Sequence, residues 1–279
     1  VPGIGYCQIG TYTTGENGKI TIPDCTIGAK FRVTELVPEG YVCEENPQEI
    51  TLKETGNVVT FQNHPIVGRI ELTKVDEFDR FLKLSGAEFT VTMEYPAGDA
   101  SLGSALSSAV MQEDNGLYYL DQIPYGTVCT IRETKAPEGY ELSEETFTVS
   151  ILEEKTYTVS SRNFPCVVNR EQLGSIQVKK VDIAGTPLSG VSFLLEYSVD
   201  GKVWRPITSR KEAYPATVGS STSAALQDGV LATREDGTAC FTGLALQTSK
   251  RFLQYRLTEI ATQPGLSLMT EPVFEGSLV

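Results

Sequence analysis

The chain has 279 residues, a formal net charge of −13 at pH 7, 25 glycines and 14 prolines. The acidic balance argues against binding to nucleic acid or to an anionic membrane, because both require basic patches. No stretch is long and apolar enough to span a bilayer, so we expect no direct membrane insertion. Frequent turn residues and few helix-like stretches predict an all-β chain with room for two β-sandwiches and part of a third.

The first predicted strands each carry a polar side chain on their apolar face. Side chains two residues apart on a strand point to the same side of a sheet. In FRVTE this rule aligns Glu35 with apolar residues, and in VVTFQN it does so for Asn63. We expect Glu35 to be buried, although residues at strand ends can also be solvated at a sheet edge.

The same pattern recurs along the chain. GRIELTKVD places Lys74 on an apolar row, CTIRE places Glu133, and TYTVSSRN places Asn163. GSIQVKKVD then does the same for Lys180, and YRLTE for Glu259. A repeated sequence of inward-facing lysine, glutamate and asparagine suggests that these side chains share one site in each module.

A buried lysine, glutamate and asparagine can form a covalent crosslink. Desolvation disfavours both charged forms, so it lowers the pKa of the amine, raises that of the acid and lets a neutral amine meet a protonated acid. The amine can then attack the asparagine side-chain carbonyl while the acid shuttles protons. This reaction expels ammonia and leaves a Lys-Asn isopeptide bond.

Turn signals repeat with the same spacing as the polar residues. The Asn17-Gly18 turn precedes Glu35 by the same interval that separates Asn115-Gly116 from Glu133. Such dipeptides between alternating runs are typical of antiparallel hairpins. A proline turn follows each glutamate, as ELVPEGY, ETKAPEGY and the degenerate EIATQPGL. Matched intervals of this kind indicate repeated modules.

Together these motifs resemble the Cna protein B-type or SpaA-like prealbumin-fold domains of Gram-positive surface adhesins and pilins. One stretch has TKVD, SGAEFTV, DNGLYYL, ETKAPEGY and TYTVSSRN in order, and a later one has KKVD, LSGVSFLL, TREDGTACFTGL and YRLTE. The resemblance implies tandem antiparallel β-sandwich modules of the prealbumin-like, Ig-like kind. We expect a partial module at 1–65, a complete one at 66–170, and one at 171–279 that lacks its last strand or its asparagine.

The resemblance also implies roles for individual residues. In the complete module, Lys74 and Asn163 would be the bond partners and Glu133 the catalytic acid. Asn169 is the alternative partner, because it stands five residues before a glycine, as Asn63 does.

The outer modules depart from the family pattern. The first has Glu35 and Asn63 but no lysine strand before them, and the third has Lys180 and Glu259 but no later asparagine. We expect that the sequence is part of a longer protein and that neither bond closes within it. The alternative is that a neighbouring chain supplies the missing strand.

Six cysteines are consistent with an oxidising compartment, but their pairing stays open because six cysteines allow many connectivities. A reduced core thiol is the alternative for Cys129, which takes the place of a core aromatic residue. The disulfide candidates are Cys7 with Cys25 or Cys43, and Cys129 with Cys166.

Enzyme classes that use a nucleophile triad or a metal find no support. The single histidine, His64, has no credible nucleophile partner, and no cluster has metal-ligand spacing. We therefore expect no metal, no cofactor and no enzymatic activity beyond one autocatalytic bond-forming event per module.

We interpret the chain as a structural stalk segment of a bacterial surface adhesin or pilin, stabilised by intramolecular isopeptide bonds. Its partners would be neighbouring modules of the same protein or polymer, outside a Gram-positive cell and anchored to its wall. One alternative is an adhesin region that binds a host protein or glycan through long loops at 94–112 and 204–231. Another is an accessory region of a secreted carbohydrate-active enzyme. No LPxTG-type sorting motif or signal peptide is present, so we expect the mature ends to lie outside this sequence.

Overall fold

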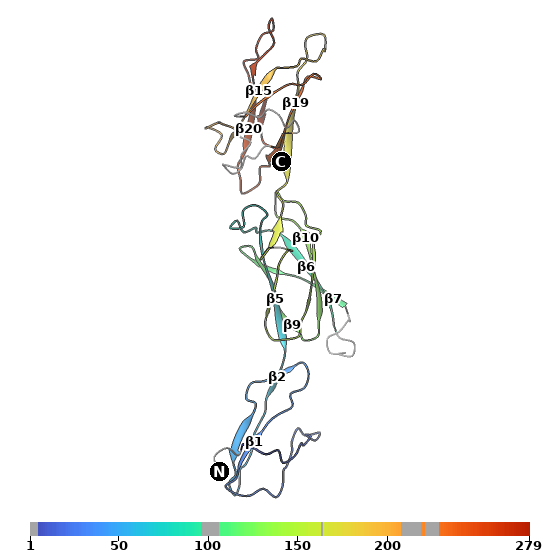
Figure 1. Cartoon of the computed structure of the whole chain (residues 1–279), viewed down its shortest axis with the longest axis vertical. Helices are drawn as coiled ribbons and strands as arrows, with labels where there is room; N and C mark the ends of the chain where they lie inside the picture. Colours follow the sequence, from blue (N-terminus) through green and yellow to red (C-terminus); the bar gives the residue numbers. More distant parts are fainter. Residues whose placement is uncertain (1–4, 96–105, 163, 208–218, 221–228) are drawn as a thin grey trace.

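A computed structural model describes residues 5–95, 106–162, 164–207, 219–220 and 229–279. The described chain is built from strands, and no helix occurs in these ranges. The strands form three groups that follow one another along the long axis of the molecule (Figure 1). Every strand lies within one of the three expected modules. We propose 1–65, 66–170 and 171–279 as the limits of these modules.

The first module contains two small sheets. Strand β1 pairs antiparallel with β3, and β2 pairs antiparallel with β4. No side chain among residues 5–65 is fully buried, so this module has no closed core of its own. Its strands are β1 (Lys30–Val33), β2 (Tyr41–Cys43), β3 (Gln48–Thr51) and β4 (Asn63–Pro65).

The second module is a sandwich of two sheets. One has the order β11-β10-β6-β7, and the other has the order β12-β5-β9-β8 with β13 also paired to β5. Both β12 and β13 run parallel to β5, whereas the other pairs are antiparallel. The strands are β5 (Val67–Asp76), β6 (Glu88–Glu94), β7 (Leu106–Val110), β8 (Gln112–Asp114), β9 (Leu117–Pro124), β10 (Val128–Lys135), β11 (Thr146–Ser150), β12 (Thr156–Val159) and β13 (Val167–Asn169).

The core of the second module follows from the alternation in its strands. In β5, Ile70, Leu72 and Lys74 are each 0 % exposed and face the opposite sheet, while the intervening side chains are half-buried. The Asn115-Gly116 turn joins β8 to β9 with positive φ values of 48° and 77°, as a tight hairpin requires. The core side chains are Ile70, Leu72, Ala87, Phe89, Val91, Met93, Met111, Tyr118, Ile123, Cys129, Ile131, Ile151, Val159 and Val167.

The third module repeats the two-sheet arrangement with its own core, which includes Phe193, Phe241 and Tyr255. One sheet has the order β14-β19-β17 and the other β16-β15-β20-β21, with β18 paired to β15. Its strands are β14 (Leu173–Lys179), β15 (Ser192–Ser198), β16 (Arg205–Pro206), β17 (Gly219–Ser220), β18 (Val230–Ala232), β19 (Thr238–Ala245), β20 (Gln254–Ala261) and β21 (Phe274–Gly276).

The fold class expected from the sequence is confirmed: the chain is all-β, with tandem sandwiches. Two details differ. The last two strands of the second module join β5 in parallel, and part of the expected 94–112 insertion is strand β7, which pairs with β6. Residues 96–105 of that range, and 208–218 and 221–228 of the other expected loop, lie outside the described residues. Within the described part, no helix is long and apolar enough to cross a membrane.

Candidate functional site

Lys74 lies near the end of β5 with its side chain inside the second module. It is 0 % exposed, and its Nζ lies 5.5 Å from the centre of the Phe89 ring. The Tyr118 hydroxyl closes the same region by donating to Leu84 O and accepting from Ala87 N, both at 3.0 Å. Burial lowers the pKa of Lys74, and the nearby charge of Glu133 opposes this only in part. A larger fraction of the Lys74 amine is therefore neutral here than in water.

Glu133 reaches the same point from β10 in the facing sheet. Its side chain is 1 % exposed, and its Oε1 lies 3.3 Å from Lys74 Nζ. The Ser143 backbone N–H donates to Oε2 at 2.8 Å, which fixes the carboxyl group. The register of β10 against β6 shifts between Glu133 and Lys135, so the strand is irregular beside the site.

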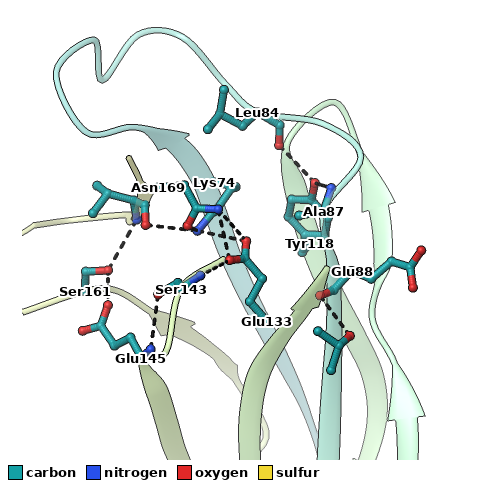
Figure 2. A network of polar contacts seen from close by, with 12 residues as sticks. Lys74, Leu84, Ala87, Glu88, Tyr118, Glu133, Ser143, Glu145, Ser161 and Asn169 are labelled. Carbon is teal, nitrogen blue, oxygen red and sulfur yellow. Dashed lines mark hydrogen bonds and ion pairs between the residues drawn. The ribbon is translucent and has the colours of Figure 1, made fainter. Parts of the chain in front are cut away.

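Asn169 ends β13 and completes the cluster (Figure 2). Its Nδ2 donates to both Glu133 oxygens, at 2.9 Å to Oε1 and 3.0 Å to Oε2. Its Oδ1 accepts a hydrogen bond from Lys74 Nζ, which also donates to Val168 O at 3.1 Å. Asn169 is 3 % exposed, so the amine, the carboxyl group and the carboxamide meet away from water.

The asparagine beside Lys74 is the alternative that the sequence offered. Asn163, the partner implied first by the family resemblance, lies outside the described residues. Val159 pairs with Leu72, and the next inward position of β5, Lys74, pairs with Val167. An uninterrupted strand would have put residue 161 there, so six residues (167 − 161) are inserted between β12 and β13.

A polar pair supports this insertion. Ser161 Oγ donates to Glu145 Oε2 at 2.6 Å and accepts from Val168 N at 3.4 Å (Figure 2). Ser161 N also bonds to Cys166 O at 3.1 Å, which closes the base of the insertion. Strand alternation gives no signal for Ser143 or Glu145, which lie outside strands, or for the hydroxyl contacts of Tyr118, which are made to the segment between β5 and β6.

A family model described as the prealbumin-like fold domain, SpaA, matches residues 4–65 and 68–164, which is more than half of the chain. The chain belongs to this family. No curated protein matches the chain.

Several solved structures are similar to this chain. The Bacillus anthracis TIE protein is 25% identical with a TM-score of 0.58, over 95% of this chain and 42% of that one. A streptococcal ancillary pilin is 18% identical with a TM-score of 0.33, over 90% and 71% of the two chains. GBS52, the minor pilin of Streptococcus agalactiae, is 14% identical with a TM-score of 0.28, over 76% and 90%. This chain spans less than half the length of the first of these relatives.

The first SpaA-type module brings together Glu35 and Asn63. Asn63 Nδ2 donates to Glu35 Oε1 at 2.7 Å, and the Glu35 main chain exchanges two hydrogen bonds of 2.9 Å with the Asn46 carboxamide. Glu35 is half-buried and not fully buried as expected. Among the described residues, Glu35 Oε2 and Asn63 Oδ1 are buried atoms without a hydrogen-bond partner.

The third module brings together Lys180 and Glu259. Lys180 Nζ lies 2.8 Å from Glu259 Oε2, with side-chain exposures of 17% and 0%. In the described chain, Glu259 Oε1 is buried without a hydrogen-bond partner. Strand β14, which leads to Lys180, is an edge strand of its sheet, whereas β5 in the second module has a paired strand on each side. The residues that would complete each outer site are thus not assembled within the described chain.

All six cysteines are free thiols in the structure, and the expected disulfide pairings stay a prediction. Cys129 is buried in the core of the second module, and burial raises the pKa of its thiol to about 11. Such a thiol is inert at neutral pH. In the part of the chain that the structure describes, no group of three or more His, Cys, Asp and Glu side chains could hold a metal ion.

Proposed function

We propose that this chain is a structural segment of a bacterial surface adhesin or pilus, in which Lys74 and Asn169 join through an autocatalytic isopeptide bond. The family match and the similarity to the Bacillus anthracis TIE protein support the structural, pilin-type role. The crosslink is proposed because Lys74 Nζ contacts the Asn169 carboxamide beside Glu133, and all three side chains are buried.

The reaction needs only the three side chains. Lys74 passes a proton to Glu133 Oε1, 3.3 Å away, and the neutral amine attacks Asn169 Cγ. Glu133 then delivers this proton to Asn169 Nδ2, to which it is already hydrogen bonded, and takes the remaining extra proton from the attacking nitrogen. The C–N bond breaks, ammonia leaves and Glu133 ends protonated. One amide bond is formed and one is broken, so no oxidant, metal or cofactor is required.

The topology gives this bond a mechanical purpose. The chain enters the second module through β5 and leaves it after β13, and these two strands lie side by side in parallel. Pulling on the two ends of the module therefore shears β5 against β13. A covalent tie from Lys74 to Asn169 would carry that load directly, and the hydrogen bonds between the strands would be protected.

Cellular location and partners follow from the same proposal. A shear-resistant tandem of sandwiches suits a surface protein outside a Gram-positive cell, attached to its wall and to neighbouring modules of the same polymer. The net charge of −13 and the absence of a membrane-spanning helix among the described residues are compatible with this location.

The test is the intact mass of the fully reduced chain, followed by peptide mapping around Lys74. The proposal expects a deficit of one ammonia and a branched peptide that joins Lys74 to Asn169. The variant Glu133→Gln keeps the shape of the side chain but cannot relay protons as a carboxyl group, and it should show the full mass. A wild-type chain of unmodified mass would refute the crosslink.

A further inference from the structure

Two identical turns lie where one module meets the next. Pro-Glu-Gly-Tyr occupies 38–41 in the first module and 137–140 in the second, in each case on the side that contacts the next module. In each, the tyrosine N–H bonds to the proline carbonyl, at 3.2 Å and 3.1 Å, and the glycine has a φ of 83° or 82°. The two turns therefore have the same backbone shape.

Each turn holds the connector that leads to the next module. Ile66 N donates to Gly40 O, and Gln172 N donates to Gly139 O, both at 2.8 Å. The connector begins three residues earlier, at Asn63 or Asn169, and continues directly into the first strand of the following module. The turn thus fixes the direction in which the chain leaves.

The glutamate of each turn contacts the following module. Glu39 Oε1 accepts a hydrogen bond of 2.9 Å from the Tyr125 hydroxyl, which follows β9. Glu138 Oε1 accepts one of 2.7 Å from Ser249 N, and its Oε2 accepts one from Ser249 Oγ, after β19. Strands β9 and β19 hold equivalent places, because each pairs with the first strand of its module. At both joints, the same position of one module therefore contacts the same part of the next module.

The glycine beside each glutamate allows this close approach. A Cβ atom at Gly40 would lie 3.2 Å from the ring of Tyr125, and one at Gly139 would lie 2.7 Å from Cγ2 of Thr248. A larger residue would also be strained at these φ values. Glycine is therefore required both by the turn and by the neighbouring module.

We propose that the Pro-Glu-Gly turn is a coupling surface whose partner is the loop after the β9-type strand of the next module. By tying the exit of one module to the body of the next, it holds successive modules in one orientation. Without such contacts, modules joined by a short connector move relative to one another by default. The proposal does not depend on the isopeptide bond.

The second joint carries an additional ion pair that acts in the same direction. Arg251 Nη1 lies 2.5 Å from Glu171 Oε1, with side-chain exposures of 12% and 17%. Arg251 also donates from Nε to Leu246 O at 3.0 Å, which holds it in the loop after β19. This pair joins the connector to the third module beside the contact of Glu138.

The third module offers a natural comparison. Its turn is Gln263-Pro264-Gly265-Leu266, with the same backbone bond from Leu266 N to Gln263 O at 3.2 Å. Proline stands where the other turns have glutamate, and the Gln263 side chain bonds back to Ser189 O at 2.7 Å. The turn shape is therefore kept without the carboxylate, which assigns the glutamate to the joint and not to turn formation.

The experiment measures whether the second and third modules tumble together. Nitrogen-15 relaxation of the full chain gives a rotational correlation time for each module, in the wild type, in Glu138→Ala and in Glu144→Ala. Glu144 is a matched control, because it is an exposed carboxylate paired within its own module to Arg132. We expect one common correlation time in the wild type and the control, and a value for the third module reduced about twofold in Glu138→Ala.

Three results would overturn the proposal: independent tumbling already in the wild type, common tumbling preserved in Glu138→Ala, or equal loosening by Glu144→Ala. Amide chemical shifts of the core residues of both modules report whether the variant is folded. The intact mass is a separate readout, because the Lys74 site lies inside the second module and its mass deficit should not change when the joint loosens. Failure of the coupling proposal is thereby distinguishable from failure of the crosslink.

Discussion

Replacing Asn169 by alanine should strongly destabilise the second module. The substitution removes the carboxamide that contacts Lys74 Nζ and Glu133, so no crosslink can form. The amine keeps its hydrogen bond to Val168 O and its ion pair with Glu133, so the variant does not leave an unpaired buried charge. The main loss is therefore the covalent tie itself.

The size of this loss follows from the loop that the tie closes. Residues 74 and 169 are 95 positions apart (169 − 74). Restricting a loop of this length in the unfolded chain is worth about 4–5 kcal/mol at 25 °C in the chain-entropy account of crosslinks. For a module of this size, each kcal/mol shifts the unfolding midpoint by about 4 °C or more, so the midpoint should fall by about 20 °C.

Scanning calorimetry of the full chain, together with its intact mass, checks this value. Asn163→Ala is the matched control, because it removes the other candidate carboxamide from the same segment. The control should keep both the wild-type midpoint and the deficit of one ammonia. Equal midpoints for the wild type and Asn169→Ala would refute the reasoning, and loss of the deficit in Asn163→Ala would move the bond to that residue.

Three further outcomes are expected. Burial lowers the pKa of Lys74 in the folded state below its ordinary 10.5, so between these two pKa values the unfolded state binds more protons than the folded state. In Asn169→Ala, which has a free Lys74 amine, the unfolding free energy should therefore rise with pH through this window. The crosslinked wild type should lack this rise in a calorimetric pH series. Lys180→Met leaves Glu259 buried without its cation and should lower the unfolding free energy of the third module by about 3 kcal/mol in urea titrations; an unchanged midpoint would show that the pair contributes nothing. Gly68→Ala places a methyl group 2.8 Å from Ile151 Cγ2 and should cost the second module about 1–3 kcal/mol, with retained stability contradicting the close packing.

The period of two along each strand was enough to predict which polar side chains face inward. It placed Lys74, Glu133 and Glu259 in the cores, where they are at most 1 % exposed. It was less successful for Glu35, which is only half-buried because no side chain of the first module is fully enclosed. Alternation gives the face of a strand, but the depth of burial depends on whether a second layer covers that face.

Strand order was harder to obtain from the sequence. Hairpin turns such as Asn115-Gly116 specify antiparallel neighbours, because a tight turn allows no other pairing. Parallel pairing of β12 and β13 with β5 has no such local signal, since the connection runs through most of the module. The Pro-Glu-Gly turns were visible as repeats, but their contacts with the next module depend on how two modules meet.

The choice between Asn163 and Asn169 shows where a strand pattern and a repeat pattern carry different information. Reading the last strand as continuous puts residue 161 beside Lys74 and residue 163 one inward position further, as TYTVSSRN suggested. The six-residue insertion after β12 moves both positions along the chain, so that Val167 and Asn169 take them. The interval of five residues from an asparagine to the glycine of the next module is unaffected by an insertion upstream of it, and it points to Asn169 as it does to Asn63. The interval to the following module is therefore the better guide to this site. The connector has the same length at both joints, whereas the strand before it is interrupted by an insertion.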